Sequence, residues 1–264
     1  MSFACEGAGL AASLDGAPGT TGVLFVTGGT QTRVGSHRMS ERLADDLAKA
    51  GYPCFRYDRR GVGDSEGSDP GWRGSGADLR AAAAAFRREC SSVERVIGFG
   101  LCDGATALAL SGAQADIDGL ILTNPWLIES EADAPPAAAI RHHYRARLLS
   151  VAGWRKILTG AISYRKLLKG VAKLAAPVPT ALSDEVAAAL AKSKRPVALI
   201  LARGDGTALA AAEAWASPTY AEVRTANPPP HIIDSSSHTF ARDGDMDTLL
   251  AACLDALSRL SSRG

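Results

Sequence analysis

Residues 98–104 read GFGLCDG and place Cys102 between glycines at positions 100 and 104. An apolar run precedes the cysteine and a helical pattern follows it, which predicts a sharp strand-to-helix turn with the thiol at its apex. Such a turn strains the apex residue and brings its neighbours too close for Cβ atoms, a demand that glycine satisfies. We interpret Cys102 as a nucleophile whose thiolate is favoured by the positive end of the following helix.

A nucleophilic thiol needs a base, and the base needs a group that orients it. Of the five histidines, His238 lies in a polar loop between the last predicted strand and the last predicted helix, where the base of such a site belongs. The acid is expected at the end of an earlier strand, and Asp205 stands there in ARGDGTA. We therefore predict a triad of Cys102, Asp205 and His238, and interpret His231 as structural.

Acyl transfer also needs two N–H donors for the oxyanion that forms on the carbonyl. The backbone N–H of Asp103, the first residue past the nucleophile, is one expected donor. The loop VTGGTQTRVGSHR after the first long strand is expected to supply the other, because its two glycines free the backbone to turn inward. Gln31 is the preferred donor and Thr30 the alternative. Asp58 and the arginines of YDRRGVGDSEG are interpreted as residues that fix loops.

Composition sets the limits within which this chemistry must fit. Of the 264 residues, 46% are apolar, so the chain can bury a core. The formal net charge is +1, which does not indicate binding to nucleic acid. The N-terminus lacks the pattern of a signal peptide and no apolar stretch is long enough to span a membrane, so we expect a cytoplasmic protein.

The five cysteines show no CxxC spacing, which argues against a disulfide framework and against a structural zinc site. We expect Cys5, Cys54, Cys90 and Cys253 to be ordinary small residues, partly buried. No metal and no organic cofactor is expected for the predicted chemistry.

Strand and helix patterns alternate along the chain. A hairpin is expected in the opening FACEGAGLAASLDG. The alternation predicts an α/β fold with a mostly parallel central sheet flanked by helices on both faces. Strands are predicted over 22–29, 53–58, 93–100, 118–125, 195–205 and 230–237, and helices over 37–51, 78–90, 105–115, 208–216 and 245–260.

One region breaks the alternation. Residues 126–190 show no strand pattern and carry helical patterns rich in Arg and Lys, without an acidic residue between Asp133 and Asp184. We interpret 126–190 as a helical cap insertion, with 1–125 and 191–264 forming the core.

The basic residues of the cap allow two interpretations. They form a solvated face, or they face an anionic substrate or an acidic surface, which includes peripheral contact with a membrane. His142 and His143 lie in the cap and cannot both face one site from adjacent helical positions.

Several motifs together resemble the α/β-hydrolases: DRRGVGDS, GLCDG, GDGTA and SHTF. More narrowly, GGTQTRVGSHR, GLCDGA, NPW and YRARLLSVAGWRKILTG resemble the exosortase A system-associated hydrolases, type 1 in particular, over most of the chain. These proteins are encoded beside bacterial exopolysaccharide and protein-sorting machinery. The resemblance implies the α/β-hydrolase fold and a Cys-Asp-His triad at Cys102, Asp205 and His238, and it implies no particular substrate. Thr30 stands where the family pattern has proline, so the oxyanion donor stays open.

The expected reaction is hydrolysis of an ester or thioester of a small-molecule acyl substrate through an acyl-enzyme on Cys102. One alternative is an acyltransferase that passes the acyl group to an alcohol or amine, because a thioester intermediate accepts these nucleophiles as well as water. The other is a catalytically degenerate binding protein, tethered by its basic cap to a membrane-associated assembly. The sequence leaves open the acyl group and the oligomeric state.

Overall fold

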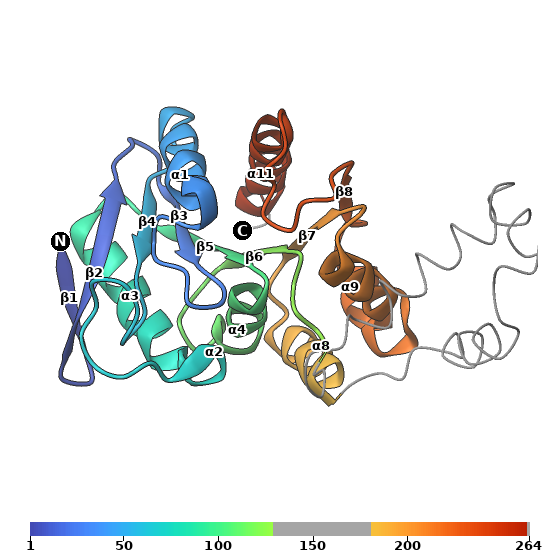
Figure 1. The fold of residues 1–264 in the computed structure, drawn as a ribbon, viewed down its shortest axis with the longest axis horizontal. Coiled ribbons are helices and arrows are strands. Elements are labelled where there is room, and N and C mark those ends of the chain that lie inside the picture. Colours follow the sequence, from blue (N-terminus) through green and yellow to red (C-terminus); the bar gives the residue numbers. More distant parts are fainter. Residues whose placement is uncertain (129–180, 263–264) are drawn as a thin grey trace, which may run out of the picture.

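The computed structural model describes residues 1–128 and 181–262 (Figure 1). Within these residues, eight strands form one sheet: β1 (Ser2–Cys5), β2 (Ala8–Asp15), β3 (Thr21–Val26), β4 (Cys54–Tyr57), β5 (Arg95–Leu101), β6 (Gly119–Thr123), β7 (Val197–Ala202) and β8 (His231–Ile233). Their order across the sheet is β1-β2-β4-β3-β5-β6-β7-β8. The pairs β1–β2 and β2–β4 are antiparallel, and every pairing from β4 to β8 is parallel.

Helices cover both faces of this sheet (Figure 1). One face carries α1 (Met39–Lys49) and α11 (Asp245–Ser261), which lie above the sheet in Figure 1. The other face carries α2 (Gly71–Gly74), α3 (Gly76–Glu89), α4 (Asp103–Ser111), α8 (Ala181–Ser193), α9 (Gly206–Ala216) and α10 (Ala221–Ala226). Two short 3-10 turns, η1 (Ser36–Arg38) and η2 (Pro218–Tyr220), complete the described elements.

The two layers of helices explain why the central strands are apolar on both sides. In β3, Val23 and Phe25 pack in the cluster with α1 and α11, whereas Leu24 and Val26 pack in the cluster with α3 and α4. Every residue of β6 and of β7 is buried. Strands covered on both faces show continuous apolar runs rather than alternation. The predicted mostly parallel sheet with helices on both faces is confirmed.

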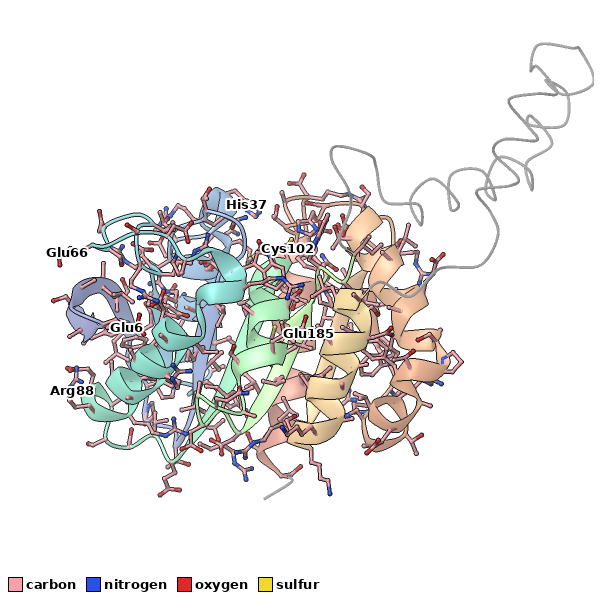
Figure 2. All side chains as sticks on the ribbon, turned by 90° about the horizontal axis from the view of Figure 1, so that it is seen from below. Glu6, His37, Glu66, Arg88, Cys102 and Glu185 are labelled. Carbon is pink, nitrogen blue, oxygen red and sulfur yellow. The ribbon has the colours of Figure 1, made fainter. Side chains whose placement is uncertain are left out.

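The parallel strands end at one edge of the sheet, so the loops that follow them gather there. Figure 2 shows Cys102, which follows β5, and His37, which follows β3, at this edge, with Arg88 toward the opposite end. Residues far apart in the sequence therefore meet at the carboxyl ends of the strands.

The predicted succession of elements is confirmed, including the opening hairpin formed by β1 and β2. Its turn residues Glu6 and Gly7 both have positive φ, 47° and 83°, as the tight turns of hairpins require. The sequence patterns missed α2 and α10, which span four and six residues and are too short to show a helical repeat.

The predicted cap boundary needs a correction. Helix α8 crosses residue 190 without interruption, and its Leu182 is fully buried in the cluster that also contains α4. The part of 126–190 that α8 contributes therefore belongs to the core. The rest of the predicted cap, residues 129–180, lies outside the described residues. No helix in the described ranges is long and apolar enough to cross a membrane.

Thr123 at the end of β6 offers a test of the core. Its side chain is fully buried, and its Oγ1 has no hydrogen-bond partner within the described part of the chain. We expect Thr123→Val to raise the free energy of unfolding by about 1 kcal/mol, because an unpaired buried hydroxyl has lost its hydration without compensation. Urea unfolding measures this change.

Thr106→Val is the matched control for this prediction. Thr106 is equally buried, but its hydroxyl donates a hydrogen bond to the Trp126 carbonyl at 2.6 Å. This variant should lower the free energy of unfolding, because the carbonyl loses a donor. A loss of stability in Thr123→Val would contradict the prediction.

Candidate active site

Cys102 stands at the turn between β5 and α4 in a backbone conformation that L residues rarely adopt. Its φ is 57° and its ψ is −128°. The turn is held from β6, because the Cys102 N–H donates to the Thr123 carbonyl at 3.1 Å. The side chain is half-buried. This combination of strain and partial exposure is typical of a nucleophile elbow.

The two glycines that flank the elbow are required by close backbone contacts. A Cβ at Gly100 would lie 2.6 Å from Cα of Ala105 in α4. A Cβ at Gly104 would lie 2.4 Å from the carbonyl oxygen of Val26 at the end of β3. The predicted need for glycine is confirmed at both positions. At Gly104 the crowding comes from the neighbouring strand rather than from the other side of the elbow.

The structure brings Cys102, His238 and Asp205 together from three loops. His238 Nδ1 lies 3.0 Å from Asp205 Oδ2, and the Cys102 thiol is a hydrogen-bonding partner of the His238 ring. Asp205 is almost fully buried at the N-terminus of α9, where Oδ2 also accepts the Ala208 N–H at 2.9 Å. The second hydrogen bond holds the carboxylate in place against the ring.

These contacts decide the charge of the histidine. The hydrogen bond to Asp205, and after it the hydrogen bond to Cys102, raise the pKa of His238 to about 10, while its burial acts in the opposite direction. Since imidazole ordinarily titrates near a pKa of about 6.5, His238 is an imidazolium at neutral pH.

The two backbone N–H groups expected to bind the oxyanion differ in whether they already have a hydrogen-bond partner. Asp103 is the first residue of α4, and its backbone N–H donates no hydrogen bond to any part of the chain that the structure describes. The N–H of Gln31 instead donates to the Gly28 carbonyl at 3.2 Å, and the Gln31 Oε1 accepts the Ser36 N–H at 3.1 Å. Both groups of Gln31 are therefore paired within its own loop. This corrects the prediction that Gln31 supplies the second N–H donor.

Gly29 is the residue of this loop whose N–H faces the elbow. It donates to Asp103 Oδ1 at 2.6 Å, and the adjacent Gly28 passes so close that a Cβ there would lie 3.1 Å from Cβ of Cys102. The loop that was predicted to face the nucleophile therefore reaches the elbow through Gly28 and Gly29.

Asp58 ties two of the loops together. It is fully buried, and it accepts hydrogen bonds from the backbone and the guanidinium of Arg33 and, at 3.1 Å, from the Asp64 N–H. Its neighbour Arg59 forms a paired hydrogen bond with Asp69 at 2.7 and 2.9 Å. The interpretation of these residues as loop anchors is confirmed.

Among the remaining histidines, one reaches the site. His37 Nε2 lies 2.9 Å from the carbonyl oxygen of Thr239, the residue that follows the triad histidine. His231 is an exposed residue of β8, and His142 and His143 lie outside the described residues. Sequence reasoning missed the contact of His37, for which the GSHR segment was the available signal.

Within the part of the chain that the structure describes, the other cysteines and the acidic residues form no second centre. Cys5, Cys54 and Cys253 are buried free thiols, and Cys90 is half-buried. Across residues 1–128 and 181–262, no group of three or more His, Cys, Asp or Glu side chains is placed to hold a metal ion.

Comparisons with known proteins identify the family and the fold of the chain. The model of the family described as serine aminopeptidase, S33, matches residues 22–173, more than half of the chain. No curated protein matches the sequence. This family usually uses a serine nucleophile, and residue 102 at the elbow of this chain is a cysteine.

Solved structures show the same fold at low identity. An esterase of Pyrococcus furiosus is 18% identical, with 99% of this chain and 90% of that chain covered and a TM-score of 0.64. Est1E from Butyrivibrio proteoclasticus, solved with ferulic acid bound, is 17% identical, with 100% of both chains covered and a TM-score of 0.64. An α/β-hydrolase from Sphaerobacter thermophilus is 18% identical, with 96% of this chain and 100% of that chain covered and a TM-score of 0.59. The chain thus has the α/β-hydrolase fold and belongs to the serine aminopeptidase S33 family.

Proposed function

We propose that this protein hydrolyses an ester or thioester of a small-molecule acyl substrate through a covalent intermediate on Cys102. The observation that carries the proposal is the continuous chain of contacts from the thiol through His238 to Asp205. Membership of a hydrolase family supports the reaction class. The cysteine nucleophile and the roles of the three residues are supported by their geometry.

The first half of the reaction forms the acyl-enzyme. The Cys102 thiolate bonds to the acyl carbon, and the electron pair of the carbonyl moves to its oxygen. When that pair returns, the bond to the leaving group breaks, and the leaving group takes the proton from Nε2 of His238. Asp205 holds Nδ1 throughout, which fixes the orientation of the ring.

The second half releases the acid. Neutral His238 removes a proton from water, and the water oxygen bonds to the thioester carbon. Collapse of this intermediate expels the Cys102 thiolate and leaves His238 protonated, so the ion pair is restored. An alcohol or amine could replace the water, which would make the enzyme an acyltransferase.

For the oxyanion we propose the backbone N–H groups of Asp103 and Gly29. The first belongs to the exposed N-terminus of α4, and the second already points at a negatively charged oxygen, Asp103 Oδ1. Preorganised backbone donors of this kind stabilise the charge that develops in acyl transfer. The substrate oxygen would have to displace the carboxylate from Gly29.

Within the family, we infer that the chain belongs with the exosortase A system-associated hydrolases, type 1. The segments GGTQTRVGSHR, GLCDGA and NPW support this assignment. They follow β3, β5 and β6, so the fold gathers them at the edge that carries the triad. Genes for exopolysaccharide and protein sorting beside this one would test the assignment.

Removing the nucleophile should abolish turnover. We expect Cys102→Ala to reduce hydrolysis of p-nitrophenyl and CoA esters of varied chain length by at least about 10³-fold, because no covalent intermediate can form. Cys90→Ala is the matched control, since Cys90 is also half-buried but lies away from the triad. It should retain full activity.

The same assay decides between water and other acceptors. Product analysis with added alcohol or amine shows whether these react with the acyl-enzyme. If most of the acyl group is transferred to them, the protein is an acyltransferase and not a hydrolase. Undiminished turnover in Cys102→Ala would overturn the proposal altogether.

The protonated histidine makes stability depend on pH. The pKa of His238 is raised to about 10 in the folded protein, whereas an unfolded histidine titrates near about 6.5. Its contribution is complete below a pH of about 6.5 and is lost as the pH rises through about 10. We expect the difference in the free energy of unfolding between wild type and His238→Gln to shrink across this range. Urea unfolding at several pH values measures it, and a difference that stays constant would contradict the assignment of charge.

The Asp103 carboxylate should slow the reaction of a neutral ester. It occupies the Gly29 N–H and its charge opposes an oxyanion beside it. We expect Asp103→Ala to raise kcat/KM by about tenfold, the equivalent of one hydrogen bond to a charged group. Asp103→Asn, which keeps an acceptor but removes the charge, should lie between. A fall in kcat/KM in both variants would show that the carboxylate assists the reaction instead.

A further inference from the structure

Asn124 is a buried polar residue that the mechanism above does not use. It directly follows β6, is fully buried, and has a left-handed φ of 42°. Its backbone N–H donates to the Ile200 carbonyl at 3.0 Å. Asparagine adopts this backbone region more readily than most residues other than glycine. Burial of an amide is costly unless its polar atoms are paired, so the partners of the side chain matter.

The side-chain amide of Asn124 joins the two loops that carry the acid and the base. Its Nδ2 donates to the carbonyl oxygen of His238 at 2.8 Å. Its Oδ1 accepts the N–H of Ala202 at 2.8 Å. Ala202 is the last residue of β7, three positions before Asp205. One side chain therefore contacts the base itself and the strand end that leads to the acid.

The segment around Asn124 also holds the nucleophile. The Thr123 carbonyl accepts the Cys102 N–H at 3.1 Å, and the Trp126 N–H donates to the Cys102 carbonyl at 3.1 Å. Residues 123–126 thus contact the elbow, the His238 loop and the end of β7 that leads to Asp205. Within this segment the contacts to the elbow come from the backbone, whereas the contacts toward His238 depend on the side chain of Asn124.

We propose that Asn124 is a positioning residue that keeps the His238 ring in line between Asp205 and Cys102. The inference rests on the proposed function, because it concerns the geometry of that reaction. Asn124 acts through the backbone of His238, because it binds the carbonyl oxygen of the same residue that carries the ring. Without this anchor the His238 loop can shift relative to β7, and the ring loses its alignment with the other two groups.

Asn227 provides a matched comparison at the other end of the same strand. Its Oδ1 accepts the Val197 N–H at 2.7 Å, and its Nδ2 donates to the Val223 carbonyl at 2.8 Å. Val197 begins β7, so this amide also makes two hydrogen bonds to the backbone, but away from the triad. If substitutions at Asn124 and at Asn227 both lower stability, that loss is structural. An effect on the reaction rate is expected only for substitutions at Asn124.

The experiment compares Asn124→Gly with Asn227→Gly. Glycine fits the φ of Asn124 without strain, so the first variant removes only the side chain. For Asn124→Gly we expect kcat to fall by about 10- to 100-fold with little change in KM, as a small misplacement of a reacting group does. Asn227→Gly should keep the wild-type kcat. Asn124→Asp, which retains the acceptor for Ala202 but loses the donor to His238, should also lose kcat.

A second measurement reports on the ion pair without turnover. In a Cys90→Ala background, the rate at which iodoacetamide alkylates Cys102 is followed against pH. In Asn124→Gly, the pH at which His238 loses its proton should fall toward that of ordinary imidazole. In Asn227→Gly, this pH should stay at the wild-type value. If wild type hydrolysed no ester, the proposed function would fail while this profile still tested Asn124. An unchanged kcat and profile in Asn124→Gly, or equal changes in Asn227→Gly, would overturn the inference.

Discussion

The backbone of Cys102 is the constraint on which the rest of the site depends. Its φ of 57° is unfavourable for any residue except glycine, at a cost of about 1–3 kcal/mol. Hydrogen bonds to Thr123 at the end of β6 and to Trp126 beyond it, together with glycines at positions 100 and 104, hold it there. The strain lifts the thiol clear of the sheet and turns α4 so that its N-terminus faces the same space. No local sequence preference would maintain this turn in isolation.

Charge around the thiol follows from this geometry. The His238 ring, whose pKa is raised, and the positive end of α4 both adjoin Cys102, and the Asp103 carboxylate opposes further negative charge beside them. Arg59 lies close enough to Asp103 to interact with it electrostatically.

The loops of the site are held by buried polar side chains that are fully paired. Asp58 joins the loops after β3 and β4, and Asn124 joins the end of β7 to the loop that carries His238. Both side chains are fully buried. A buried polar group without a partner is costly, so each of these residues penalises any arrangement of the loops other than the one observed. This is how a site built on loops can keep the precision that proton transfer needs.

Much of this protein could be predicted from local patterns, because they encode short-range requirements. The elbow at Cys102 was visible in a strand, two glycines and a helix, and His238 was identified by its position in the chain. The contact of Gly29 with the elbow could not be predicted, because the Asp103 carboxylate that accepts its N–H lies 74 residues away. Asn124 was missed because its two side-chain partners lie 78 and 114 residues away. The sequence determined the elements and the chemical groups, and the register of the assembled sheet decided which of those groups meet.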